Sequence, residues 1–267
     1  MNIHPTAIVD NKAELADNVK VGPYAIIGPG VEIGSSTTIG AHVVLKGATS
    51  IGENCCIFTG ACIGDIPQDL KYKHDTKSFL KIGNDNIIRE YVTMNPGTKE
   101  GGATSIGNGN LFMAYSHVAH DCNIGNSCII ANSGTLAGHV TLEDKAVIGG
   151  LAAIHQFVRV GKMSIIGGCS KIVQDVPPFS TCDGHPAKVY GLNAIGLRRS
   201  DISREAQNAL KKAFKILFYS GLTFKGSADK VRQELGNCKE IVYLLEFIKN
   251  SKRGVCRGAE QNRPDSG

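Results

Sequence analysis

The chain has 267 residues and a formal net charge of +5 spread along its length, so a basic surface for wrapping nucleic acid is excluded. Its 32 glycines, lack of tryptophan and 6% aromatic content do not fit a compact sandwich or barrel, although the length allows a buried core. Nine cysteines include no CxxC pair and no zinc-ligand spacing. No secretion signal and no apolar run of about 20 residues is visible, so we expect a cytoplasmic protein with reduced thiols.

An apolar residue recurs at every sixth position along most of the chain. The count runs from Ile3 to Ile63, resumes from Ile82 to Met94 and continues from Ile106 to Ile172. Glycine often follows the apolar residue, and the position four after it is small or β-branched, a combination that predicts a short strand and a corner. Such units bury their faces only by stacking as a solenoid. The pattern resembles the hexapeptide-repeat family, whose left-handed parallel β-helix uses about 18 residues per coil.

Two polar segments interrupt this count. Ile63 and Ile82 are 19 residues apart, one coil plus one residue, and the polar run PQDLKYKHDTKS between them predicts a loop near residues 65–80 extruded from a corner. A second segment at 97–104 is rich in Gly, Thr and Lys and predicts another loop. Long loops on a rigid scaffold often carry function.

The hexads stop after QDVPP, and helical spacing follows. SREAQNALKKAFKILFYSG begins with a Ser N-cap and a nearby Glu and ends at Gly221, and SADKVRQEL and KEIVYLLEFIKN are also helical in pattern. We therefore predict a mainly β chain with a β-helix over residues 1–190, a C-terminal α-helical domain over 191–255 and a disordered tail over 256–267.

Three histidines fall at related places in the hexads. His139 lies 19 residues after His120, and His155 lies 35 after it, each within one residue of a multiple of 18. None occupies the inward apolar position, so we expect them along one edge of the β-helix in successive layers about 4.8 Å apart. Zinc is the alternative, but its ligand nitrogens must lie about 2.1 Å from one point, and side chains spread over three layers converge poorly. We expect no metal and no cofactor.

Several motifs in fixed order carry a closer resemblance. SHVAHDC, LAGHV, GGLAAIHQF, GGCS, QDVPP and GLRRSDISREA resemble the UDP-N-acetylglucosamine O-acyltransferases that start lipid A synthesis. The similarity runs from Ile3 to about Arg253 and includes the QDLKY segment. It implies transfer of an (R)-3-hydroxyacyl chain from the thioester of acyl carrier protein to the 3-hydroxyl of UDP-N-acetylglucosamine. A sugar hydroxyl needs a base at neutral pH, and histidine titrates in that range.

The same resemblance assigns residues to roles. His120 matches the general base, Asp121 the residue that orients it, and the Gly138 N–H the donor to the oxyanion. Because adjacent strand side chains point to opposite sides, a contact between His120 and Asp121 requires an irregular corner. Residues matched to substrate contacts are Gln68, Asp69, Lys71, His117 and His139 around the sugar, His155 and Gln156 along the nucleotide and pantetheine, and Asn193 and Arg199 at uridine and phosphate. Gly168 matches the position that sets acyl length, and glycine there implies an open groove and a long chain near hydroxymyristoyl.

The family's assembly and partners are implied in the same way. Members form homotrimers with sites in clefts between neighbours, which would bring the QDLKY loop of one chain to the histidines of another. Basic residues of the helical tail could meet acidic carrier protein or simply form a solvated face. These are Arg198, Lys211, Lys212 and Lys215. Two positions depart from the family pattern near the nucleotide, Ile195 in place of a common Glu and Ser200 in place of a second Arg.

Other functions stay open at this stage. The acceptor sugar could be the 3-amino analogue of UDP-N-acetylglucosamine, which would give an amide. The later N-acyltransferase of the pathway carries a uridine-binding domain ahead of its coils, whereas hexads here begin at Ile3. A zinc enzyme resembling γ-class carbonic anhydrase would use the histidines as ligands. A purely structural β-helix gives no reason for the histidine edge.

Overall fold

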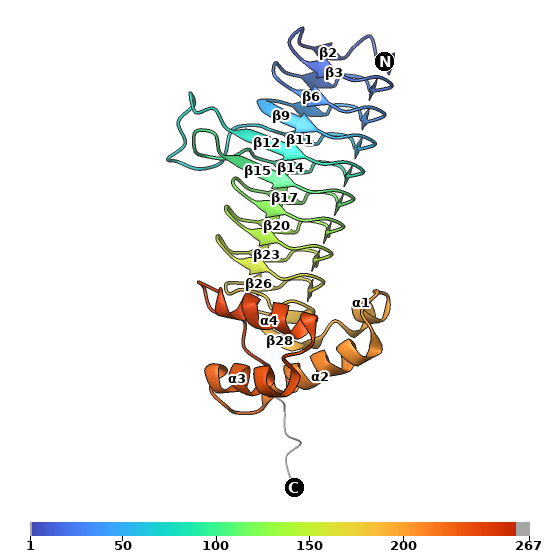
Figure 1. Ribbon diagram of the computed structural model, residues 1–267. Coiled ribbons are helices and arrows are strands. Elements are labelled where there is room, and N and C mark those ends of the chain that lie inside the picture. The colour runs from blue at the N-terminus through green and yellow to red at the C-terminus, as the bar shows by residue number, and fades with distance from the viewer. Residues whose placement is uncertain (1, 260–267) are drawn as a thin grey trace.

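The structure is a computed structural model that describes residues 2–259; Met1 and residues 260–267 lie outside the described part. Short parallel strands stack into a left-handed β-helix with three faces, and four helices follow at its C-terminal end (Figure 1). Among the described residues, no helix is both long enough and apolar enough to cross a bilayer.

Each coil contributes one strand to each face. The first face contains β1 (Asn2–Ile3), β4 (Lys20–Val21), β7 (Thr38–Ile39), β10 (Cys56–Ile57), β13 (Ile87–Ile88), β16 (Leu111–Phe112), β19 (Ile129–Ile130), β22 (Val147–Ile148), β25 (Ile165–Ile166), β27 (Ser180–Gly184) and β28 (Ala187–Leu192). The second face contains β2 (Ile8–Val9), β5 (Ile26–Ile27), β8 (Val44–Leu45), β11 (Cys62–Ile63), β14 (Thr93–Met94), β17 (His117–Val118), β20 (Thr135–Leu136), β23 (Ala153–Ile154) and β26 (Lys171–Ile172). The third face contains β3 (Glu14–Leu15), β6 (Glu32–Ile33), β9 (Ala48–Ile51), β12 (Phe79–Ile82), β15 (Ala103–Ile106), β18 (Asn123–Ile124), β21 (Thr141–Leu142) and β24 (Arg159–Val160).

The six-residue count is confirmed by the burial of the core. From Val21 to Ile172, every apolar position of the count is at most 4% exposed. These side chains point into the prism, and full burial of each aliphatic one stabilises the fold by roughly 1.5–3 kcal/mol. The small inward positions are filled by thiols at Cys55, Cys122 and Cys128, all at most 1% exposed.

The polar loops leave the β-helix at the corner between the second and third faces. Ile63 ends β11 and Ile82 ends β12, so the 19 steps between them replace a single hexad. The first loop is therefore an insertion into one corner, as the sequence predicts. The second loop occupies 95–102, because Ala103 and Thr104 already belong to β15. Both loops project from one side of the β-helix beside β12 and β15 (Figure 1).

Helices follow an antiparallel hairpin of β27 and β28, which extends the first face. They are α1 (Ala194–Arg198), α2 (Arg204–Tyr219), α3 (Phe224–Leu235) and α4 (Lys239–Lys249). The predicted Ser cap of α2 is Ser203, whose side chain accepts the Ala206 N–H at 3.2 Å. The predicted boundary after residue 190 falls inside β28, since the hairpin continues the sheet.

The chain after α4 returns to the last coil. Val255 forms a parallel bridge with Asp175, and the Cys256 N–H donates to the Asp175 carbonyl at 2.9 Å. Cys256 is 1% exposed, so the prediction of a tail from residue 256 is wrong for 256–259, where burial and backbone hydrogen bonds hold the segment. The rest of the predicted tail, 260–267, lies outside the described residues.

Candidate active site

Three histidines share one corner of the β-helix, as the coil arithmetic predicts. The pairing of β17 with β20 and of β20 with β23 aligns the residues after these strands in successive coils. His120, His139 and His155 therefore all lie between the second and third faces, in three consecutive coils. We call this corner the histidine edge. It is also the corner from which both polar loops emerge.

The corner has the left-handed backbone that a His120–Asp121 contact requires, and this conformation recurs at every sixth residue from Tyr115 to Cys169. Asp121 has a φ of 58°, and in the next coils His139 and Phe157 have φ of 60° and 67°. A left-handed residue is uncommon without glycine, and here it reverses the side-chain direction. The coils stay bonded through the turn, because the His139 N–H donates to the His120 carbonyl at 2.9 Å. As a result, consecutive side chains His120 and Asp121 face each other.

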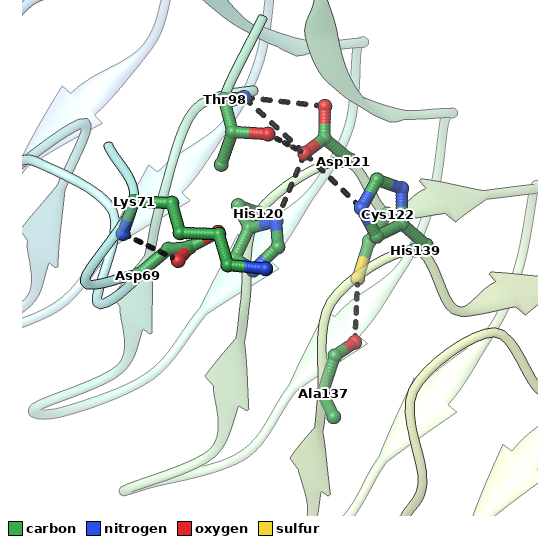
Figure 2. Close-up of polar contacts among 8 residues, drawn as sticks. All are labelled: Asp69, Lys71, Thr98, His120, Asp121, Cys122, Ala137 and His139. Carbon is green, nitrogen blue, oxygen red and sulfur yellow. Dashed lines mark hydrogen bonds and ion pairs between the residues drawn. The ribbon is translucent and has the colours of Figure 1, made fainter. Parts of the chain in front are cut away.

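Asp121 is the centre of the polar cluster (Figure 2). Its Oδ2 lies 2.9 Å from His120 Nδ1 and 3.6 Å from His139 Nε2. The Thr98 hydroxyl donates to the same oxygen at 2.6 Å, and the Thr98 N–H lies 3.2 Å from both carboxylate oxygens. A proton on His120 Nδ1 thus points at the carboxylate, which leaves Nε2 as the free acceptor of the ring.

Gly138 lies directly under the His120 ring. A Cβ built on Gly138 would lie 2.6 Å from His120 Nε2 and 3.0 Å from Nδ1, closer than real contacts allow. The sequence predicts glycine here for close approach of substrate to the backbone, and the structure adds a second reason, close approach of the histidine. The Gly138 N–H donates to no group within residues 2–259. It is thus available to an oxyanion.

Electrostatics keep the cluster in one charge state at neutral pH. Burial raises the pKa of Asp121, but hydrogen bonds from Thr98 and His120 outweigh it and leave that pKa below its ordinary value. Burial lowers the pKa of His139 and outweighs the negative charge of Asp121, which acts to raise it. Burial and then the neighbouring His120 lower the pKa of His117, whose Nδ1 lies 2.7 Å from the Thr93 hydroxyl. The carboxylate is ionised, and His117 and His139 are neutral.

The first loop brings two predicted residues to this edge within the same chain. Asp69 is half-buried and accepts the Lys71 N–H at 2.9 Å, while Gln68 and Lys71 are exposed. The Asp69 charge partly opposes the lowering of the His139 pKa by burial, and Figure 2 shows Asp69 and Lys71 on the side of His120. The loop thus lies at the histidine edge of its own chain; its approach to the histidines of another chain stays a prediction.

Other predicted residues lie apart from the cluster in a single chain. His155 is exposed, and its Nδ1 lies 3.2 Å from the carbonyl of Gln156. Gly168 is exposed at the corner between the first and second faces. Arg199 is exposed at the end of α1, on the side of the β-helix opposite the loops (Figure 1). Their roles stay predictions.

Asn193 is buried, and its side chain caps α1. It is 6% exposed, donates to the Met163 carbonyl at 2.8 Å and accepts the Gly196 N–H at 2.8 Å as the N-cap of α1. Of the two departures from the family pattern, Ile195 is 56% exposed and the Ser200 hydroxyl donates to the Leu197 carbonyl at 2.7 Å.

The sequence alone did not identify two residues of the site, Thr98 and Phe157. Thr98 lies 23 positions before Asp121 in a polar loop, and no pattern points to it. Phe157 stacks on His139 with ring centroids 4.7 Å apart. Its spacing of 18 residues from His139 could have placed it in the same column.

His120, Asp121 and His139 are the residues that could hold a metal ion, since their ligand atoms lie within 4.8 Å of one another. Hydrogen bonds to Asp121 explain why these three side chains lie close together, however. The Asp121 Oδ2 atom already accepts from the Thr98 hydroxyl at 2.6 Å and faces His120 Nδ1 at 2.9 Å. We assign no metal to this cluster.

Comparison with known proteins fits this arrangement. The family model of UDP N-acetylglucosamine O-acyltransferase, domain 2, matches residues 175–256, and the bacterial transferase hexapeptide model matches 12–47 and 103–138. Proteins named acyl-[acyl-carrier-protein]–UDP-N-acetylglucosamine O-acyltransferase match nearly end to end. That of Thermodesulfovibrio yellowstonii is 54% identical over 96% of this chain and 99% of its own length. The chain belongs to this family.

Solved structures of the O-acyltransferase family agree. The Acinetobacter baumannii protein is 43% identical with a TM-score of 0.90, covering 96% of this chain and 99% of its own. The UDP-N-acetylglucosamine acyltransferase of Bacteroides fragilis is 40% identical with a TM-score of 0.92, covering 96% and 100%. The similarity spans both the β-helix and the helical end.

Proposed function

We propose that this chain transfers an (R)-3-hydroxyacyl group from acyl carrier protein to the 3-hydroxyl of UDP-N-acetylglucosamine, the first step of lipid A biosynthesis. The names of its relatives supply the donor and the acceptor. The observation that carries the proposal is the His120–Asp121 contact of 2.9 Å beside the Gly138 N–H. A base and an oxyanion donor within one cluster are what acyl transfer to a hydroxyl needs.

The reaction follows from these positions. His120 Nε2 removes the proton of the sugar hydroxyl as its oxygen attacks the thioester carbonyl. Asp121 stabilises the imidazolium, and the Gly138 N–H donates to the oxyanion. When the tetrahedral intermediate collapses, the C–S bond breaks, and the imidazolium returns its proton to the pantetheine thiolate. The net products are the ester and the free thiol of the carrier.

The surrounding residues bind the two substrates in this proposal. Asp69 and Lys71, with Gln68, His117 and His139, surround the sugar at the histidine edge. His155 and Gln156 continue along the same edge toward nucleotide and pantetheine.

Nucleotide binding and chain length involve more distant positions. Arg199 offers a guanidinium suited to a diphosphate, and the exposed face of α1 beside Asn193 contacts uridine. Gly168 leaves the acyl groove open for a long chain. These residues lie away from the histidine edge of their own chain, so they act on the site of a neighbouring chain.

A homotrimer provides that neighbour, and the outer surface of the β-helix supports it. From β13 to β25 the outward positions of the first face form an aliphatic stack, whereas those of its first four strands and of the third face are mostly polar. The stack is Ile87, Leu111, Ile129, Val147 and Ile165; the third face has Glu14, Glu32, Ser50, Lys81, Ser105, Asn123, Thr141 and Arg159. A contiguous aliphatic surface marks an association face, and identical chains close symmetrically around it. The trimer works in the cytoplasm, where acyl carrier protein docks near basic residues such as Arg198 and Lys211.

The deciding experiment is incubation of the purified protein with UDP-N-acetylglucosamine and hydroxyacyl carrier proteins of graded chain length. Mass spectrometry should find the 3-O-acyl product, with turnover highest for chains near hydroxymyristoyl. His120→Ala should remove turnover without changing the circular dichroism spectrum. Absence of product from every donor, with both UDP-N-acetylglucosamine and its 3-amino analogue, refutes the function.

A further inference from the structure

Resting on the proposed function, we propose that Thr98 is a positioning residue of the reaction: its hydroxyl holds the Asp121 carboxylate toward His120. The Thr98 Oγ1–H donates to Asp121 Oδ2 at 2.6 Å, shorter than the 2.9 Å from the same oxygen to His120 Nδ1. Hydrogen bonds to a carboxylate at such a distance are charge-assisted and strong. The reaction thus depends on a group 23 residues away in the second loop.

Asp121 needs this restraint because two histidines compete for one oxygen. His120 Nδ1 lies 2.9 Å and His139 Nε2 lies 3.6 Å from Oδ2. The two rings meet edge to face with centroids 5.2 Å apart, so a small rotation of the carboxylate exchanges one partner for the other. Thr98 contacts the carboxylate from the loop side through its hydroxyl and its backbone N–H. This bidentate contact fixes the rotation that serves His120.

The loop that carries Thr98 is itself anchored. The Gly97 N–H donates to the Phe79 carbonyl at 3.2 Å, and the Gly101 N–H donates to the Lys77 carbonyl at 2.8 Å. The two ends of the loop close tightly, because a Cβ on Gly97 would lie 2.7 Å from the Gly102 carbonyl carbon. Thr98 is therefore placed by backbone contacts with the end of the first loop and not by its own side chain. A rigid support of this kind is what precise orientation of a catalytic group requires.

Charged and titratable groups around the cluster come from three elements. Lys99 in the second loop and Asp69 in the first loop act on His139. His117 on β17 is influenced by His120. None of these is altered by changing Thr98. Loss of its hydroxyl would free the carboxylate to rotate toward His139, and Asp121 would then stabilise protonated His120 less. His120 would lose its proton at a lower pH, but its ring would no longer be held for the reaction.

The test uses three variants of the full chain. Thr98→Val removes the hydroxyl and keeps the shape, Thr98→Ser restores a hydroxyl, and Thr104→Val makes the same chemical change at a nearby buried position. The Thr104 hydroxyl has no hydrogen-bond partner in the described part of the chain, so it does not donate to Asp121. Acyl transfer is measured as kcat and KM across pH. Independently, the rate of His120 modification by diethyl pyrocarbonate is followed against pH by peptide mass spectrometry, since only neutral imidazole reacts.

For Thr98→Val we expect kcat to fall roughly 10- to 100-fold, the loss of one charge-assisted hydrogen bond, with KM little changed. The acid limb of the pH–rate profile and the pH of half-maximal modification should both move downward, because Asp121 no longer stabilises protonated His120. Thr98→Ser should restore most of the rate and both pH values, and Thr104→Val should match the wild type.

Three results overturn the inference: a wild-type profile in Thr98→Val, a rate loss without any pH change, or the same pH change in Thr104→Val. If the wild type transfers no acyl group, the proposed function fails instead, and the modification profile still decides the role of Thr98. If Thr98→Val does not fold by circular dichroism, Thr98→Ala replaces it in the same comparison.

Discussion

Replacement of Gly138 by alanine tests the geometry of the base directly. The added Cβ would lie 2.6 Å from His120 Nε2 and 3.0 Å from Nδ1, whereas ordinary carbon contacts begin near 3.4 Å. The ring must move by several tenths of an ångström to about one ångström, which breaks the 2.9 Å contact with Asp121. A misplacement of that size costs on the order of 10²-fold in rate. The variant keeps the backbone N–H of residue 138. A lower rate would therefore result from displacement of the His120 ring and not from loss of the oxyanion donor.

The assay is the initial rate of acyl transfer, with a thermal melt as the measure of folding. Overpacking of this kind costs about 1–3 kcal/mol, which a stacked β-helix should tolerate. Gly150→Ala is the matched control, because a Cβ there would meet only the Asn132 carbonyl oxygen at 3.4 Å. We expect Gly150→Ala to keep the wild-type rate. A fully active Gly138→Ala protein would refute the placement of His120 against this glycine.

Four further outcomes are expected. Thr104→Val should raise the melting temperature and stabilise the fold by about 1 kcal/mol, since its buried hydroxyl has no hydrogen-bond partner among residues 2–259; a lower melting temperature would contradict this. Treatment with a strong chelator should leave acyl transfer unchanged, because protons from Thr98 and His120 already satisfy Asp121; loss of activity restored by zinc would show a resident metal. The pKa of His117 is depressed in the folded chain, so its contribution to stability is complete above the unfolded value of about 6.5 and is lost as pH falls below it. Chemical denaturation of wild type and His117→Gln should therefore diverge less at pH 5.5 than at pH 7.5, and the reverse order would show the sign to be wrong. Ile129→Glu should convert the assembly to monomer in sedimentation, and an unchanged mass would place the association face elsewhere.

The β-helix could be predicted from the sequence because its six-residue period is set within each short repeat. Each hexad buries one apolar residue, so the count from Val21 to Ile172 predicts the core, and multiples of 18 predict that His120, His139 and His155 share an edge. The same arithmetic says nothing about inserted residues. The polar run between Ile63 and Ile82 nevertheless indicated the first loop, which occupies a corner as predicted.

What only the tertiary structure decided is which side chains meet at the corners and loops. The left-handed φ of Asp121, a regular feature of the corners, turns it toward His120, and a loop 23 residues upstream delivers Thr98 to the same carboxylate. Asn193 caps α1 by accepting the Gly196 N–H, and Cys256 is buried against the last coil, where its N–H donates to the Asp175 carbonyl. The contacts of Thr98 and Cys256 join residues far apart in sequence. A repeat determines the spacing between its own units, but the hydrogen bonds of an insertion depend on where the folded chain brings it.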